Sequence, residues 1–361
     1  MRFVRKIKDL LPPSSRSFHQ FRKLEADRFD YLVRELEQSY GQIEALLNSQ
    51  AKTLNNNLEV HDTHMKMLAW DACRKPNETV LQAKKRFFKE IPPATGSSRL
   101  VQLGCVQLLR AFNKLCLDYN LRYWAGGGTL IGAIRHNGFI PWDDDVDLCM
   151  PRCDLERLTD TLRSSKDYKL SVVYDPFVLC CQYRFVFRDE NIPCFLDIFP
   201  FDFSNDKKGK EKAFQVREEL KQNLISCAVY EEWIGEGCVE NGHPLSSQIQ
   251  TVFSTSLSSC TDRGLIARDG GIYFVRGIDN FDDPNGYHWS SRVDEVFPLK
   301  WVAFENTEIA IPSNYETLLF GAYGDIFELP KDIHSHFDHI AGAISDQQET
   351  DSAIRARLDE D

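Results

Sequence analysis

Two unusual runs of residues lie close together in the segment 121–150, and they constrain the fold more than any other feature of the chain. Gly126, Gly127 and Gly128 follow a short apolar stretch and precede a stretch compatible with a helix. Glycine lets the backbone approach a ligand closely, and Thr129 can cap the helix after it. Because free backbone N–H groups and a helix N-terminus attract anions, the pattern predicts a strand–turn–helix that cradles a phosphate.

The glycine run alone is also compatible with a simple tight turn. It is not a Walker A loop, because Ala133 follows Gly132 where that motif requires lysine. It is not a dinucleotide-binding fingerprint either, because Ile131 stands where the third glycine of the match would fall. A phosphate-binding role therefore needs support from other residues nearby in the sequence.

The second run contains Asp143, Asp144, Asp145 and Asp147 between apolar residues. In a strand, alternate side chains share a face, so Asp145 and Asp147 point together and Asp143 can extend the row. Such carboxylates repel one another unless a cation lies between them, and their oxygens suit Mg²⁺ or Mn²⁺. An EF-hand loop is excluded, because Leu148 stands where that loop needs glycine. A solvated acidic turn is the alternative, and the apolar flanks disfavour it.

Asp197 is the one charged residue in the apolar segment 195–199. An isolated acid there is costly without a partner, so we expect it to be the third metal ligand. Arg135 and His136 follow the glycine run and are candidates for holding phosphate charge, although a structural hydrogen bond explains His136 equally well. A glycine cradle beside strand carboxylates is what phosphoryl or nucleotidyl transfer requires.

The rest of the chain divides into segments with different residue patterns. Within the catalytic region these patterns predict helices over 99–120, 208–230 and 313–323, and strands over 170–174, 182–187 and 195–199. An apolar stripe with three- and four-residue steps predicts a long helix before residue 75, with a narrow seam typical of a coiled coil. This seam predicts a homo-oligomer, and a helix folded back on the catalytic domain is the alternative. The expected segments are a basic N-terminal segment (1–17), the coiled-coil-like helix (18–74), a linker (75–97), the catalytic domain (98–344) and a flexible acidic tail (345–361).

Charge and cysteine usage limit the partners and the compartment. The net charge of −11 argues against broad nucleic-acid binding. Residues 1–23 are strongly basic, which suits an anionic membrane surface or simply a solvated tail. The eleven cysteines include no C-x-x-C pair, which is typical of reduced thiols. Without a long apolar run or a signal-like start, we expect a cytoplasmic protein, with peripheral contact on the inner membrane face.

At this point the core of the sequence closely resembles the signature of the LicD family. These are phosphocholine-transferase-like proteins with fukutin and the fukutin-related protein as eukaryotic relatives, in the nucleotidyltransferase superfamily. The resemblance covers about 98–340. Its blocks are 123–147, from Tyr123-Trp124 to Asp145-Val-Asp147; 195–202, which contains Asp197; and the shorter matches 296–299, 304–305, 323–325 and 329–330.

The resemblance implies an α+β protein with the DNA polymerase β-like fold, a mixed sheet flanked by helices. It implies a metal-dependent phosphotransferase with a CDP-linked alcohol as donor and a glycan or lipid-linked sugar as acceptor. Carried over by position, Gly127, Gly128 and Thr129 would cradle the donor phosphates. Asp145, Asp147 and Asp197 would bind Mg²⁺ or Mn²⁺, with Asp143 as a further candidate, and would activate the acceptor hydroxyl.

The sequence departs from the family pattern in three places. Gly126 is extra to the usual glycine pair, the segment 232–290 has no obvious match, and the first 97 residues lie outside the pattern. An aromatic cage would recognise choline, and Trp142 is one of several aromatic residues available for it. Two other functions stay open: a nucleotide-sugar glycosyltransferase with a D-x-D metal site, and an inactive coiled-coil interaction protein.

Overall fold

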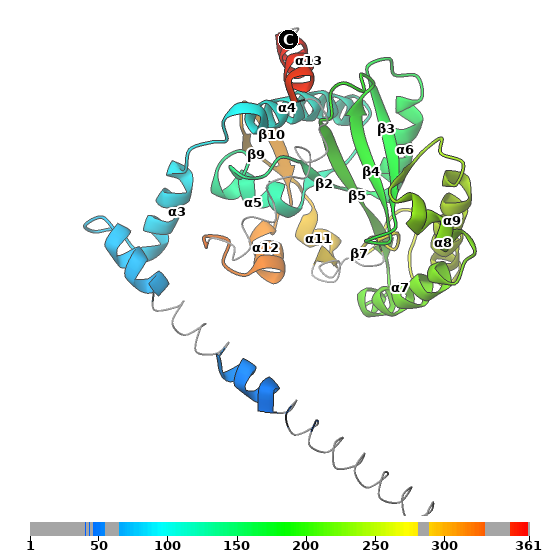
Figure 1. Ribbon diagram of the computed structural model, residues 1–361, viewed down its shortest axis with the longest axis horizontal. Coiled ribbons are helices and arrows are strands. Elements are labelled where there is room, and N and C mark those ends of the chain that lie inside the picture. Colours follow the sequence, from blue (N-terminus) through cyan, green and yellow to red (C-terminus); the bar gives the residue numbers. More distant parts are fainter. Residues whose placement is uncertain are drawn as a thin grey trace, which may run out of the picture. The chain divides into compact units, whose positions relative to one another are not determined.

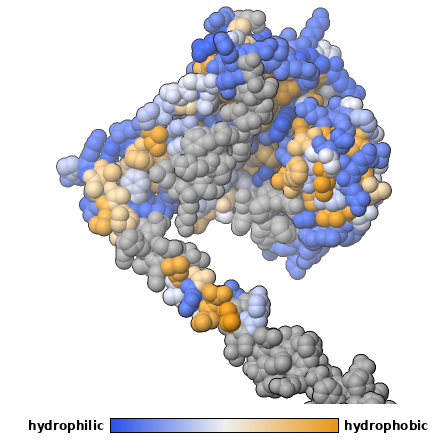
Figure 2. Space-filling view, in the orientation of Figure 1, coloured by the Kyte–Doolittle hydropathy of each residue, from blue (hydrophilic) through white to orange (hydrophobic). Residues whose placement is uncertain are grey.

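The computed structural model describes residues 40, 43, 46–54, 65–280, 289–328 and 347–359, which fall into two compact units divided after Val80. In the first unit, residues 46–54 and 65–73 are helical, and Leu46, Leu47 and Leu54 are exposed. Figure 2 shows orange, apolar surface on this part of the chain. The predicted segments 1–17 and 18–39 lie outside the described residues, so the coiled coil stays a prediction.

The second unit begins within a helix that the sequence did not predict. Residues 75–97 were expected to be a linker, but they contain α3 (Val80–Glu90), which buries Ala83 and Phe88. The prolines at 76, 92 and 93 lie outside this helix and therefore do not interrupt it. The next helix is α4 (Gly96–Asp118), close to the predicted 99–120.

The centre of the second unit is a mixed sheet of eight strands among the described residues (Figure 1). Its main path runs in the order β1-β2-β5-β4-β3-β6, and β7 joins β5 and β8. The pair β2–β5 is parallel and the other pairs are antiparallel. The strands are β1 (Trp124–Ala125), β2 (Asp147–Pro151), β3 (Tyr168–Asp175), β4 (Cys180–Phe187), β5 (Phe195–Ser204), β6 (Val239–Glu240), β7 (Tyr273–Arg276) and β8 (Ser291–Arg292).

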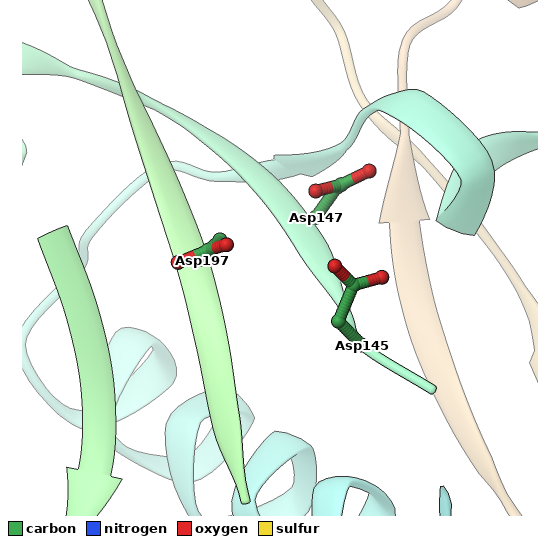
Figure 3. Close-up of side chains that lie close together, drawn as sticks. All are labelled: Asp145, Asp147 and Asp197. Carbon is green, nitrogen blue, oxygen red and sulfur yellow. The ribbon is translucent and has the colours of Figure 1, made fainter. Parts of the chain in front are cut away.

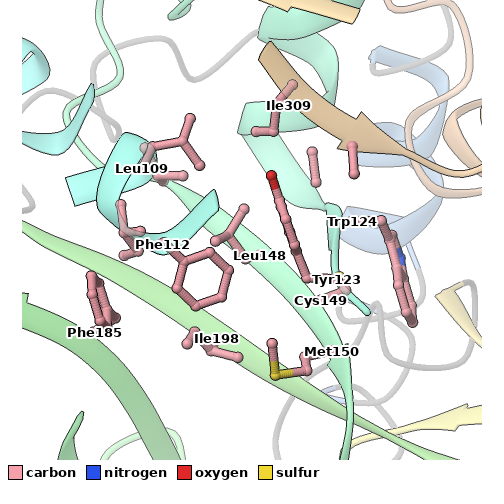
Figure 4. Packing of buried hydrophobic residues seen from close by; sticks show 14 of the residues in the cluster. Leu109, Phe112, Tyr123, Trp124, Leu148, Cys149, Met150, Phe185, Ile198 and Ile309 are labelled. Atoms are coloured by element: carbon pink, nitrogen blue, oxygen red, sulfur yellow. The ribbon is translucent and has the colours of Figure 1, made fainter. Parts of the chain in front are cut away.

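The main hydrophobic core lies between this sheet and α4 (Figure 4). Phe112 of α4 packs edge-on against Phe185 of β4, with ring centroids 5.4 Å apart. Leu148 and Ile198 lie opposite one another in the parallel β2–β5 pair and belong to the same core. Because strand side chains alternate, the neighbouring Asp147 and Asp197 are directed to the other face of the sheet.

Helix α6 (Arg152–Leu162) follows β2 in the chain, and three further helices come after β5. Helices α7 (Gly209–Ile225), α8 (Val229–Glu236) and α9 (Ser246–Asp262) form a second hydrophobic cluster with Tyr174 of β3. This cluster closes around the fully buried Trp233 of α8. Its members from Trp233 to Ile278 lie in the segment that had no obvious family match, so the described part of that segment contributes to a separate core.

The remaining elements complete the unit. They are α5 (Gly127–Arg135), α11 (Val293–Val296), the hairpin of β9 (Lys300–Phe304) and β10 (Thr307–Ile311), α12 (Tyr315–Tyr323) and α13 (Gln347–Asp359). Helix α13 differs from the expected flexible tail, because Ile354 is buried and Gln107 of α4 donates a hydrogen bond to the carbonyl of Arg357. A single apolar anchor in a polar helix was too weak a pattern to reveal this packing. Among the described residues, no helix combines the length and the apolar character needed to cross a membrane.

Candidate metal centre and active site

Three carboxylates meet where β2 and β5 run side by side (Figure 3). Asp147 of β2 and Asp197 of β5 lie directly opposite one another in the parallel pair. Asp145 lies two residues before Asp147, just ahead of β2. One oxygen from each of the three side chains lies within 4.8 Å of the other two. The structure thus brings together the three acids that strand alternation and the isolated charge at Asp197 had predicted.

The electrostatics of the cluster favour a bound cation. Burial, followed by the charges of Asp145 and Asp197, raises the pKa of Asp147 to about 8. Burial and the nearby Asp145 and Asp147 also raise the pKa of Asp143 well above its usual range. Both shifts mean that the protein offsets the negative charge of these acids only in part, and three carboxylate oxygens are suitable ligands for a hard divalent cation. The residues present therefore fit Mg²⁺ or Mn²⁺, with Asp143 beside the cluster.

The glycine run is packed directly against these acids. Gly127 has a φ of +46°, and a Cβ added there would lie 1.9 Å from Oδ2 of Asp147. A Cβ added to Gly128 would lie 2.5 Å from Oδ2 of Asp143. The backbone N–H of Gly128 donates a hydrogen bond of 3.2 Å to Asp147. Glycine is required at 127 and 128 because the acids occupy the space that a side chain would fill.

Thr129 holds the start of β2 and does not cap α5. Its hydroxyl oxygen accepts a hydrogen bond of 2.8 Å from the backbone N–H of Asp147. The N-cap is Gly126, which has no side chain to accept from the helix, so the prediction that Thr129 caps this helix is wrong. The helix begins three residues earlier than the sequence pattern suggested, because glycine at 127 permits the turn.

Arg135 and His136 lie at the other end of α5 and make their contacts with α3 and the segment 326–328. The guanidinium of Arg135 donates to the carbonyl of Ile326 at 2.6 Å and lies 4.4 Å from the ring centroid of Phe88. It also donates to Nε2 of His136 at 2.9 Å. Burial and the Arg135 charge lower the pKa of His136 to about 4. Both residues have structural partners here, and a role in phosphate binding stays a prediction.

Trp142 is partly buried and packs against the main hydrophobic core. The structure thus gives this residue a packing role. Its expected contact with a donor alcohol is still a prediction.

Sequence reasoning missed two arginines that border the carboxylates. Arg184 of β4 donates to Oδ1 of Asp197 at 3.0 Å, and its guanidinium lies 4.2 Å from the ring centroid of Phe195. Arg276 of β7 lies 4.6 Å from the ring centroid of Phe199, and its charge lowers the pKa of Asp147. Arg184 is a charge in an otherwise apolar segment, the same signal that identified Asp197. The position of Arg276 depends on the pairing of β7 with β5, which the sequence pattern does not reveal.

Asp202, a further acid on β5, belongs to a separate buried network. Arg152 donates to Oδ1 of Asp202 at 2.6 Å and to Oδ2 of Asp279 at 2.9 Å. Asp202 and Asp279 are both buried, so this arginine joins the start of α6 to β5 and to the segment after β7. Asp202 is thus ion-paired and structural, and is not a fourth member of the carboxylate cluster.

The fold and the site define a mixed α/β protein with a carboxylate cluster that could hold a metal ion. Residues 120–226 match the family model described as "LicD/FKTN/FKRP, nucleotidyltransferase domain". This range contains the glycine run and all three clustered acids. Residues 120–226 are therefore similar to the nucleotidyltransferase domain of the LicD family, as the sequence resemblance indicated.

Curated proteins give the same result. The chain is 28% identical over 269 residues to the lipopolysaccharide cholinephosphotransferase LicD of Haemophilus influenzae, covering 67% of this chain and 96% of that protein. It is 31% identical over 161 residues to the human ribitol 5-phosphate transferase FKRP, covering 43% of this chain and 32% of that protein. The chain thus spans nearly the whole bacterial relative and about a third of the human one.

Proposed function

We propose that this chain is a LicD-like phosphotransferase that moves a phospho-alcohol from a CDP-linked donor to a hydroxyl of a glycan. The observation that carries the proposal is the cluster of Asp145, Asp147 and Asp197 packed against the turn at Gly127 and Gly128. The two relatives support it, because each is named as a transferase of a phospho-alcohol, choline phosphate in one and ribitol phosphate in the other. In this proposal the sheet belongs to the DNA polymerase β-like class.

The proposed reaction is an in-line transfer of the phospho-alcohol from the pyrophosphate of the donor to the acceptor hydroxyl. The acceptor oxygen forms a bond to the phosphorus that carries the alcohol, the bridging bond of the pyrophosphate breaks, and CMP leaves. The hydroxyl proton passes to a carboxylate of the cluster. A divalent cation held by Asp145, Asp147 and Asp197 would neutralise phosphate charge and favour the ionised acceptor oxygen.

The arginines and the glycine turn supply the rest of the phosphate site in this proposal. Arg184 and Arg276 are held in place by stacking on Phe195 and Phe199, so little side-chain freedom is lost when they bind phosphate oxygens. The N-terminal end of α5 adds backbone N–H groups and the positive end of a helix dipole. Together these groups hold the donor phosphates while the carboxylates face the acceptor.

The direct test incubates the full chain with CDP-choline or CDP-ribitol, an acceptor glycan, and Mg²⁺, Mn²⁺ or chelator. We expect release of CMP and a product heavier by the phospho-alcohol, with both lost in chelator. Asp145→Asn and Asp147→Asn should each lower transfer at least about 100-fold, because a metal ligand is lost. Asp118→Asn, an exposed acid at the end of α4, is the matched control.

Two other outcomes would each support a different function. A glycosyltransferase with a D-x-D site would release a nucleoside diphosphate from a nucleotide sugar. An inactive interaction protein would bind neither donor nor metal. Retained transfer in folded Asp145→Asn and Asp147→Asn chains would contradict the assigned role of the carboxylates.

A further inference from the structure

A large groove lies on the second unit, and none of its lining residues belongs to the carboxylate cluster. It has a volume of about 860 Å³, which is within the range of ligand-binding pockets. Four elements form its walls: α3, the C-terminal half of α5, β9 and α12. Ala133 and Arg135 of the family signature lie in its lining, but the proposed chemistry at the carboxylates does not use this groove.

Most of the groove surface is hydrocarbon or aromatic. Ala133 and Ile134 line it from α5, and Val302 lines it from β9. Phe320 of α12 and Leu81 of α3 also line it, and these two side chains are 72% and 51% exposed. Large apolar side chains are rarely left open in a concave surface unless something apolar covers them.

One rim of the groove is basic. Leu81, Lys85 and Lys89 follow one another at intervals of one helical turn along α3, and all three line the groove. Lys84, on a different side of α3, is paired with Asp325 and Glu328. For Lys85 and Lys89, no ion pair is recorded within the described part of the chain.

The acids that line the groove leave this rim positive. Asp325 is paired with Lys84. Glu316 lies on α12, where its carboxylate accepts a hydrogen bond from the hydroxyl of Tyr315. Lys85 lies 5.5 Å from the ring centroid of Phe327, so one of the two rim cations is already held above an aromatic side chain of the groove.

We propose that this groove binds a single anionic amphiphile, with a lipid phosphate at Lys85 and Lys89 and its hydrocarbon chain along Phe320 and Ile134. Two cations one turn apart match one phosphate group, and the apolar walls match the carbon chain next to it. Neither a sugar alone nor inorganic phosphate would use both features. Cationic side chains next to an apolar surface are the combination that a lipid phosphate requires.

Helix α5 connects the groove to the carboxylates. Gly128 at one end of this helix contacts the acids, and Ile134 at the other end lines the groove, about 9 Å away along the helix axis. On the proposed function, the amphiphile is the lipid carrier of the acceptor, with its sugar reaching from the groove to the carboxylates. The role of the amphiphile as acceptor carrier rests on the proposed transfer reaction, whereas its binding in the groove does not.

The test measures binding of dihexanoyl phosphatidic acid, below its micelle concentration, to the full chain by calorimetry in chelator. We expect binding that dihexanoyl phosphatidylcholine and inorganic phosphate do not match. The double variant Lys85→Gln/Lys89→Gln should weaken it about tenfold to 30-fold, because each cation adds to the attraction. Phe320→Ser should weaken it as well, because the exposed ring would no longer cover the chain.

Matched controls separate the groove from general charge and from the catalytic centre. Lys114→Gln/Lys166→Gln makes the same charge change on exposed lysines outside the groove, and Phe177→Ser removes an equally exposed ring at the β3–β4 turn. Both should bind like the unmodified chain, and so should Asp145→Asn, even if the transfer reaction fails. Equal loss in the lysine control, full replacement by inorganic phosphate, or preference for an acidic amphipathic peptide would overturn the inference.

Discussion

Asp147 is held by three hydrogen bonds, two at its backbone and one at its carboxylate. Its N–H donates to the Thr129 hydroxyl, its carbonyl accepts from Gly126, and its carboxylate accepts from Gly128. The hydrogen bond from Gly128 orients the side chain beside the other acids. Its position is set before any ligand arrives, which is the preorganisation that a metal site needs.

The close approach of Gly127 to Asp147 predicts that one methyl group added at position 127 disturbs the metal site. Gly127→Ala should weaken divalent-cation affinity at least about tenfold, because the new Cβ displaces the carboxylate and the left-handed backbone is strained. The matched control is Gly235→Ala in α8, where a Cβ meets nothing within 4 Å. Calorimetric titration with Mn²⁺ measures both variants, and equal affinities would contradict the cradle.

The raised pKa of Asp147 predicts an unusual pH dependence. With a pKa of about 8, the folded protein binds a proton that the unfolded chain has released above its usual pKa near 3.9. The metal-free protein should therefore lose stability as the pH rises from about 5 to 8, whereas metal affinity should increase over the same range. Thermal unfolding in chelator at several pH values tests this. Asp147→Asn should flatten the trend, and a trend of the same size in that variant would exclude Asp147 as its source.

At the scale of elements, the parallel pair β2–β5 aligns the acids and the core at the same time. Leu148 and Ile198 are opposite one another on the α4 side, so Asp147 and Asp197 must be opposite on the other. A shift of one residue between the two strands would turn one of these acids toward α4 and separate it from the other. Packing of the core thus determines the geometry of the site.

The packing of α13 on α4 predicts that the C-terminal helix stabilises the second unit. Ile354 is 1% exposed, so Ile354→Ala should lower the free energy of unfolding by about 2–4 kcal/mol. Arg355→Ala, on the exposed side of the same helix, should change it by less than about 0.5 kcal/mol. Denaturant unfolding of the two variants gives the comparison, and equal stabilities would mean that α13 does not contribute to the core.

The elements also show where sequence reasoning succeeded and where it could not. The strands near 170–174, 182–187 and 195–199 and the helices near 208–230 and 313–323 were predicted, because their local patterns match their burial. Helix α3 and helix α13 were missed, because each has only one or two buried residues. Arg276 was missed because its place beside Asp147 depends on long-range strand pairing, which no local pattern encodes.

At the scale of the whole molecule, the charge distribution separates a basic N-terminal segment from an acidic remainder. We predict that residues 1–23 strengthen attachment to anionic membranes, because this segment contains seven basic residues and one acidic residue. Deletion of this segment should lower sedimentation with anionic liposomes, and salt should have the same effect. Unchanged binding of the shortened chain at low salt would end the idea.

The central claim is that Asp145, Asp147 and Asp197 together hold a divalent cation in front of the glycine turn. Anomalous diffraction from a crystal of the full chain grown with Mn²⁺ and a CDP-linked alcohol tests it most directly. The account predicts an anomalous peak in contact with an oxygen of each of the three carboxylates, with donor phosphate density beside Gly127 and Gly128. Carboxylates that stay free of metal under these conditions, or a peak elsewhere with the phosphates, would contradict it.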